Sequence, residues 1–211
     1  MRTYPEILSE LLRNRIIAIL RVRDAETAER GVRALANGGI RSIEIAMNTP
    51  GALDVIRRTS DCRELLVGAG TVLDETTCRL AIMNGAQYVV TPTLNEGVIR
   101  CAGRYQKPVV CGCMTPTEML RAAELGVNMI KIFPASEFSP SSLRAFKGPL
   151  PQFLMGPTGG VNLGNLKDWD RNGADFFGIA GEFSTLADAG EFEHLTQIAA
   201  EYMLEAGKRG E

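Results

Sequence analysis

The chain has 211 residues, of which 45% are hydrophobic, and a formal net charge of −2. This length and composition predict a single domain over residues 1–211 with a large apolar core. The balanced charge excludes an electrostatic footprint for nucleic acid or an acidic membrane, and no window is apolar for long enough to cross a bilayer. Residues 1–15 contain acidic side chains and no cleavable apolar segment, so we expect a cytoplasmic protein.

Residues that usually bind metals or act as nucleophile–base pairs are scarce. The five cysteines are odd in number, only Cys111 and Cys113 lie close together, and the single histidine is His194. We therefore expect free buried thiols and no metal site. A Ser–His or Cys–His pair and a His-rich zinc site both lack the histidine that they need. Proton transfer must use carboxylate, lysine, tyrosine or water.

Apolar periodicity and turn residues divide the chain into a regular series of elements. An amphipathic helix over 4–14 precedes a strand over 16–20. Seven more strands are expected over 42–47, 65–69, 87–90, 108–111, 128–133, 153–155 and 176–180. Helices that follow the strands are expected over 24–37, 50–58, 75–84, 95–104, 115–125, 141–146, 162–172 and 187–205.

This alternation of strands and helices determines the predicted fold class. Short turns between the elements require parallel strands joined by right-handed crossovers. We predict an α/β fold, a (β/α)8 TIM barrel with an extra N-terminal helix. The alternative is an open, doubly wound sheet. It lacks the expected GxGxxG turn, since the stretch 68–71 has no third glycine.

The strand over 128–133 contains a lysine among apolar residues. Strand side chains alternate, so Ile130 and Ile132 face one way while Lys131 faces the other. A desolvated lysine loses its proton more easily, and its neutral amine can form a Schiff base with a carbonyl. The alternative is an amine that reaches solvent at the strand end or pairs with a carboxylate.

Glu44 is likewise a charged residue among apolar residues, in the second strand. Its neighbours Ile43 and Ile45 should pack on the helices, which places Glu44 inside the barrel. Beside Lys131 it could be a buried ion pair. It could equally be a general acid/base that moves protons while the lysine imine accepts electrons, which is how carbon–carbon bonds next to a carbonyl are made and broken.

Two glycine-rich turns end the seventh and eighth strands, where barrels often bind phosphate. Gly159 and Gly160 expose backbone N–H groups, and Asn162 begins a helix whose N-terminus attracts anions. The second turn contains Gly178 and Gly181. Together the turns favour an anion site.

Several segments in order resemble one enzyme family. They are Glu44, Gly68-Ala69-Gly70-Thr71-Val72-Leu73, Thr91-Pro92, Lys131-Ile132-Phe133-Pro134 and Pro157-Thr158-Gly159-Gly160-Val161. With them the chain, from about Ile16 to Gly181, resembles the class I aldolases for 2-keto-3-deoxy-6-phosphogluconate (KDPG) and 4-hydroxy-2-oxoglutarate (KHG). The aldolases for 2-keto-3-deoxy-6-phosphogalactonate belong to the same family.

The resemblance implies cleavage of a keto acid to pyruvate and an aldehyde, with Lys131 as the Schiff-base lysine and Glu44 as the acid/base. It implies no cofactor beyond the lysine imine, no metal, and a homotrimer. It places the substrate-binding residues at Arg21, Asn48, Thr71, Thr91, Pro92, Thr158, Gly159, Gly160, Gly181 and Glu182.

Two positions depart from the family pattern. Asn48 stands where the phosphogluconate aldolases have an arginine for the pyruvate carboxylate, a charge that Arg21 could replace. Glu182 stands where the phosphate loop commonly has serine, and a carboxylate repels phosphate. Either Glu182 points away, or the substrate is a non-phosphorylated 2-keto-3-deoxy acid.

Two other functions stay open. The first is an isomerase or decarboxylase barrel that uses Glu44 as base and Lys131 only as an electrophile. The second is a barrel kept as a binding protein. Only the aldolase requires a covalent imine.

Overall fold

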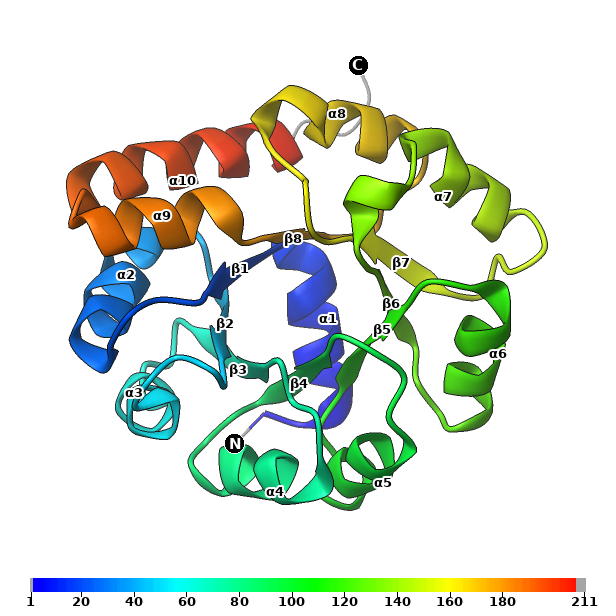
Figure 1. Cartoon of the computed structure of the whole chain (residues 1–211), viewed down its shortest axis with the longest axis horizontal. Helices are drawn as coiled ribbons and strands as arrows, with labels where there is room; N and C mark the ends of the chain where they lie inside the picture. Colours follow the sequence, from blue (N-terminus) through cyan, green and yellow to red (C-terminus); the bar gives the residue numbers. More distant parts are fainter. Residues whose placement is uncertain (1, 208–211) are drawn as a thin grey trace.

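The structure is a computed structural model that describes residues 2–207 (Figure 1). Its strands are β1 (Ile16–Leu20), β2 (Ser42–Ala46), β3 (Leu66–Gly70), β4 (Tyr88–Thr91), β5 (Val109–Cys113), β6 (Met129–Ile132), β7 (Leu154–Pro157) and β8 (Phe177–Ile179). Its α-helices are α1 (Tyr4–Asn14), α2 (Ala25–Asn37), α3 (Ala52–Thr59), α4 (Glu75–Met83), α5 (Glu96–Arg104), α6 (Pro116–Glu124), α7 (Pro140–Lys147), α8 (Leu163–Arg171), α9 (Gly181–Ala189) and α10 (Phe192–Gly207). A short 3₁₀ helix, η1 (Ala135–Glu137), follows β6.

The strands form a barrel. They are parallel, in the order β7-β6-β5-β4-β3-β2-β1-β8. Between β7 and β8 the ring is closed by a parallel bridge from Thr158 to Gly178 and by a 2.9 Å hydrogen bond from Asp175 N–H to the Met155 carbonyl. Helices surround the ring of strands in Figure 1. The predicted barrel with an extra N-terminal helix is therefore confirmed.

Side chains alternate between the helix layer and the barrel interior, as a period of two requires. Ile43 and Ile45 of β2, like Ile130 and Ile132 of β6, belong to the cluster between strands and helices. A second, interior cluster contains Ile17, Leu66, Tyr88, Val90, Val110, Met129 and Phe176. Lys131 lies two residues from Met129 in β6 and therefore faces the interior. Glu44 lies between Ile43 and Ile45, which face the helices, so it faces the interior too.

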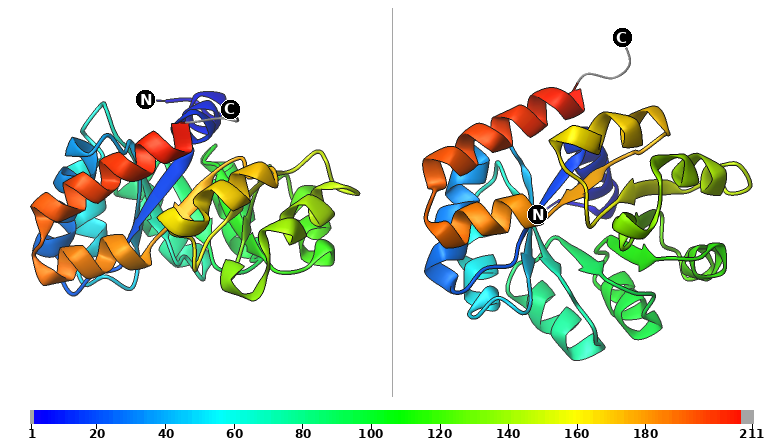
Figure 2. Two further views of the ribbon diagram at one scale, coloured as in Figure 1. Left: turned by 90° about the horizontal axis from the view of Figure 1, so that it is seen from above. Right: turned by 45° about the horizontal axis from the view of Figure 1, so that its top comes forward.

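Helix α1 closes the amino end of the barrel. Ile7 and Leu11 are fully buried and pack on the interior cluster. Figure 2 (left) shows α1, in dark blue, at one end of the molecule. With the amino end filled by apolar side chains, a polar substrate has access to the interior only from the carboxyl ends of the strands, where barrels place their chemistry.

Two predicted helices differ from the structure. The C-terminal segment is divided at Gly190, whose φ of 77° ends α9 in the left-handed region that glycine tolerates. Helix α9 begins at Gly181, so the expected single helix over 187–205 is wrong. Pro50 lies before α3, because Gly51, with a φ of 76°, is the residue that caps this helix. Within residues 2–207, no helix combines the length and apolarity that a membrane span needs.

Candidate active site

Lys131 points into the barrel from the middle of β6. Its lateral partners are Gly112 on β5 and Gly156 on β7, so no side chain from either neighbouring strand fills the space beside it. Only 6% of the residue is exposed. The ammonium lies 4.6 Å from the ring centroid of Phe133, which is a cation–π distance.

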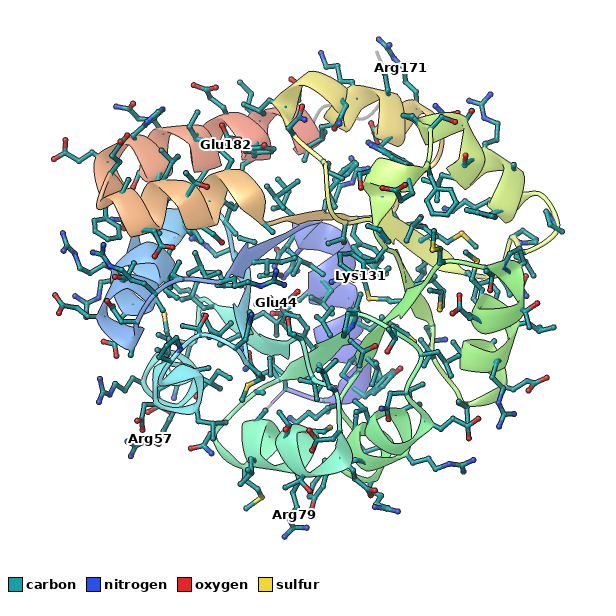
Figure 3. All side chains as sticks on the ribbon, viewed as in Figure 1. Glu44, Arg57, Arg79, Lys131, Arg171 and Glu182 are labelled. Atoms are coloured by element: carbon teal, nitrogen blue, oxygen red, sulfur yellow. The ribbon has the colours of Figure 1, made fainter. Side chains whose placement is uncertain are left out.

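Glu44 approaches the same interior from β2. It is 2% exposed, and its lateral partner on β3 is Gly68. The carboxylate lies over Gly70, because a β-carbon placed on Gly70 would overlap Oε1 of Glu44 at 1.7 Å. Glycine at position 70 is therefore what leaves room for the carboxylate. Figure 3 shows Glu44 and Lys131 inside the ring of strands, while Arg57, Arg79 and Arg171 lie on the outer helices.

The two buried groups shift each other's ionisation without forming a salt bridge. Burial lowers the pKa of Lys131, the charge of Glu44 opposes this, and the charge of Arg21 lowers the pKa further. Burial raises the pKa of Glu44, while Lys131 and Arg21 lower it. A lysine whose pKa is lowered and a glutamate whose pKa is raised are suited to take up and release protons during a reaction.

Arg21 and Thr71 meet at the mouth of the barrel. An Nη of Arg21 donates to Thr71 Oγ1 at 3.5 Å, and the Arg21 backbone N–H donates to Ser184 Oγ. Thr71 has a φ of 56°, a strained conformation for a β-branched residue. Backbone strain of this kind collects at functional sites. The pair is exposed enough to meet a substrate and close enough for Arg21 to act on both buried groups.

Unpaired backbone N–H groups gather after β7 and at the start of α9. Gly159 and Gly160 have φ values of 87° and 84°. Their amides, and those of Gly181 and Glu182, donate to no group in the part of the chain that the structure describes. The cap position of α9 is Ala180, which offers no side-chain acceptor. These donors are available to an anion.

The N-terminus of the following helix, α8, is expected from the sequence to attract an anion, and the structure corrects this expectation. Its cap residue Asn162 accepts from Gly164 N–H, and Asn165 accepts from the Asn162 N–H in return. This capping box uses the amides that would otherwise face an anion. The unpaired amides at this rim therefore belong to the 159–160 turn and to α9, while α8 uses its own in the capping box.

The remaining predicted residues fall into two groups. Thr158 is buried and faces the interior over Gly178, and the Pro92 backbone lies over Gly112. Thr91 alternates to the helix side, where its hydroxyl accepts from Gly112 N–H at 3.4 Å, so the structure does not bring it into the site.

Two more predicted residues, Asn48 and Glu182, lie at the outer edge of the candidate site. Asn48 is exposed in the turn after β2 and lines a surface hollow with Pro50 and Asn84. Glu182 accepts a 2.7 Å hydrogen bond from the Tyr202 hydroxyl of α10. Figure 3 shows it beside that helix, away from Lys131. The sequence left two possibilities, a Glu182 side chain that points away or a substrate without phosphate. The structure shows a side chain that points away.

Sequence reasoning did not assign roles to three interior residues. Phe133 contacts the Lys131 ammonium, Gly70 makes room for Glu44, and Tyr88 places an unpartnered hydroxyl in the interior. Strand alternation put Phe133 on the face of Lys131 and could have indicated the first of these. The other two depend on side-chain directions across neighbouring strands, which the sequence pattern does not contain.

The fold and the site together define a (β/α)8 barrel with an amine and a carboxylate buried at its carboxyl end and unpaired backbone amides at its rim. A family model for KDPG and KHG aldolases matches residues 7–199. The chain belongs to the KDPG and KHG aldolase family, whose members are lyases.

Relatives carry the names of three aldolase activities. The 2-dehydro-3-deoxy-phosphogluconate aldolase of Pseudomonas aeruginosa is 41% identical over 138 residues, 64% of this chain and 63% of that protein. The 2-dehydro-3-deoxy-6-phosphogalactonate aldolase of Escherichia coli K12 is 35% identical over 192 residues, 89% and 92% of the two chains. The KHG/KDPG aldolase of the same organism is 30% identical over 88% of this chain and 89% of that protein.

Solved structures share the fold. A native KDPGal structure superposes with a TM-score of 0.85 at 34% identity, covering 92% of this chain and 95% of the other. KDPG aldolase from Legionella pneumophila, with pyruvate captured as a covalent carbinolamine, has a TM-score of 0.81 at 23% identity, covering 88% and 92%.

Proposed function

We propose that this chain is a class I aldolase that cleaves a 2-keto-3-deoxy sugar acid, or 4-hydroxy-2-oxoglutarate, to pyruvate and an aldehyde. The observation that carries the proposal is the pairing of Lys131 with Glu44 inside a barrel closed at its other end. Burial favours the neutral amine at Lys131 and a protonatable carboxyl at Glu44. The aldolase names of the relatives support the same reaction.

The geometry supports a cycle in which each proton has a donor and an acceptor. The neutral Lys131 amine attacks C2 of the keto acid to give a carbinolamine. Its hydroxyl leaves as water with a proton taken from solvent, which gives a protonated imine. Glu44 takes the proton of the C4 hydroxyl while the C3–C4 bond breaks and its electrons enter the imine, leaving an aldehyde and an enamine. Glu44 returns this proton to C3 of the enamine, which gives the protonated pyruvate imine and restores the carboxylate. Water then hydrolyses the imine to pyruvate and the free Lys131 amine, and the remaining proton passes to solvent.

The test of this proposal is chemical trapping. Borohydride added with pyruvate should reduce the imine to a stable amine, and peptide mass mapping should place it on Lys131. This result also separates the aldolase from an isomerase or decarboxylase that uses Lys131 only as an electrophile, since only the aldolase forms the imine. Folded protein that yields no adduct on Lys131 would contradict the aldolase assignment.

We infer further that the preferred substrate carries a phosphate. The free amides of Gly159, Gly160 and Gly181 can donate to phosphate oxygens, and Glu182 is turned toward Tyr202. A phosphorylated 2-keto-3-deoxy acid should have a kcat/KM roughly 10- to 100-fold above that of its unphosphorylated analogue, the scale of one or two charge-assisted hydrogen bonds.

Steady-state kinetics with both substrates measures this ratio. Glu182→Gln is the matched control, because it removes the charge of a carboxylate that already points away. The ratio should stay within about threefold of wild type, since an exposed charge held away from the site has little effect there. Equal kcat/KM values for the two substrates would overturn the phosphate inference and leave the aldolase reaction in place.

We also propose a homotrimer. Among residues 2–207, the exposed large apolar side chains are Leu73, Leu80, Met83, Met114, Leu120 and Leu204. All but the last lie on α4, on α6 or just before these helices, and apolar side chains gathered on one side favour contact between copies. Light scattering should give the mass of three chains. Met83→Glu should lower that mass, whereas Leu204→Glu should not, and a monomeric wild type would contradict the proposal.

A further inference from the structure

Tyr88 is a buried polar residue that the proposed cycle does not use. The residue is fully buried in the interior cluster. Its hydroxyl has no hydrogen-bond partner in the described part of the chain. A buried hydroxyl without a partner is costly, and it persists in native proteins mainly where another group or a ligand uses it. The barrel interior around it contains the catalytic pair.

The phenol extends toward the strand that carries Glu44. Glu44, Gly68 and Tyr88 are lateral partners on the adjacent strands β2, β3 and β4. A β-carbon placed on Gly68 would lie 2.4 Å from Cζ of Tyr88 and 2.5–2.6 Å from its two Cε atoms. The hydroxyl-bearing end of the ring therefore lies over Gly68, having crossed from β4 over the middle strand.

The Glu44 carboxylate lies over the other inward-facing glycine of the same strand. It contacts the space above Gly70, two residues beyond Gly68. Two residues along a strand span about 6.6 Å. The carboxylate over Gly70 and the phenol end of Tyr88 over Gly68 therefore lie on the same face of β3, and neither glycine puts a side chain between them.

Three ionisable groups face Glu44: Lys131 from β6, Arg21 from the end of β1, and Tyr88 from β4. Burial and the charge of Glu44 both raise the pKa of Tyr88 well above its ordinary value. The phenol therefore stays protonated and serves as a donor throughout the range in which Glu44 titrates. Lys131 and Arg21 act on Glu44 by charge alone, since neither donates a hydrogen bond to it in this structure.

We propose that Tyr88 is a positioning residue for Glu44, donating a hydrogen bond to the ionised carboxylate when it turns from Gly70 toward Gly68. The inference rests on the proposed role of Glu44 as acid/base. The hydrogen bond stabilises the carboxylate form that accepts a proton, and it opposes the burial that favours the neutral form. The barrel thereby holds its base ionised without a salt bridge to Lys131.

The test is Tyr88→Phe, which removes one oxygen and keeps the ring. Loss of the donor destabilises the carboxylate, so the pKa of Glu44 rises by about 0.5 to 1 unit. Titration of carbon-13-labelled glutamate carboxyls should show this rise, with the Glu44 signal assigned by its loss in Glu44→Gln. The acid limb of kcat/KM should move to higher pH, and the same substitution in a Glu44→Gln background should not move it.

Two further variants test whether the shift depends on the position of the Tyr88 hydroxyl. Gly68→Ala keeps the hydroxyl but displaces the ring, and it should raise the pKa of Glu44 in the same direction. Tyr105→Phe removes a hydroxyl that accepts from Arg79 on the outer surface, and it should leave the titration unchanged.

The outcomes separate this inference from the proposed function. An unchanged Glu44 titration in folded Tyr88→Phe that still traps pyruvate on Lys131 overturns the role of Tyr88 alone. Failure of the wild type to trap pyruvate overturns the proposed function. An upward shift that persists in the Glu44→Gln background assigns the limb to Lys131 and also overturns the inference.

Discussion

Lys131→Ala should reduce aldol cleavage to the background rate while the barrel remains folded. The amine is the only lysine nitrogen that faces the interior at the carboxyl ends of the strands, among the residues that the structure describes. Alanine cannot form an imine, so the step that accepts the electrons of the C3–C4 bond is lost. Pyruvate release measures turnover, and borohydride reduction should leave no pyruvate adduct on the variant.

Lys107→Ala is the matched control. Lys107 is also buried, with 8% exposed, and burial lowers its pKa as it does for Lys131. It precedes β5, at the amino end of the barrel, so it lies at the wrong end for the chemistry. Turnover in Lys107→Ala should stay near wild type. Cleavage at a near wild-type rate in Lys131→Ala would show that the reaction does not need a Schiff base on Lys131.

The inward placement of Lys131 and Glu44 could be predicted because it depends only on the two-residue period of a strand. Alternation alone placed Lys131 opposite Ile130 and Ile132, and Glu44 opposite Ile43 and Ile45. The structure confirms both faces. The barrel followed in the same way, since regular alternation of strands and helices leaves few topologies.

Features that depend on where a side chain turns could not be predicted. The sequence predicts that Asn162 begins a helix and that Glu182 follows the eighth strand, but it does not predict their hydrogen bonds. Asn162 accepts from the α8 backbone, and Glu182 accepts from Tyr202, which turns its carboxylate away from Lys131. The sequence does not distinguish Gly190 from the other glycines of the chain. Its positive φ shows that α9 ends there and that α10 is a separate helix. The Tyr88 ring extends over Gly68 of the neighbouring strand, a contact that sequence periodicity does not encode.

Glu44→Gln should slow turnover roughly 10²- to 10⁴-fold, the scale of a lost general acid–base group. Glutamine keeps the shape of the side chain over Gly70 but cannot take up or release the proton of the C4 hydroxyl. The amine should remain competent, because the Glu44 charge raises the pKa of Lys131 and its removal leaves burial and Arg21 to lower that pKa further. Borohydride should therefore still trap pyruvate on Lys131.

Exchange of the pyruvate methyl protons with deuterated water isolates the role of Glu44. The exchange requires only the imine, the enamine and a group that moves the proton at C3, so it does not depend on the identity of the aldehyde. In Glu44→Gln the exchange should slow together with cleavage, while the yield of trapped imine is maintained. If exchange and cleavage both stay near wild type, Glu44 acts only as a buried charge beside Lys131, and water must carry the proton.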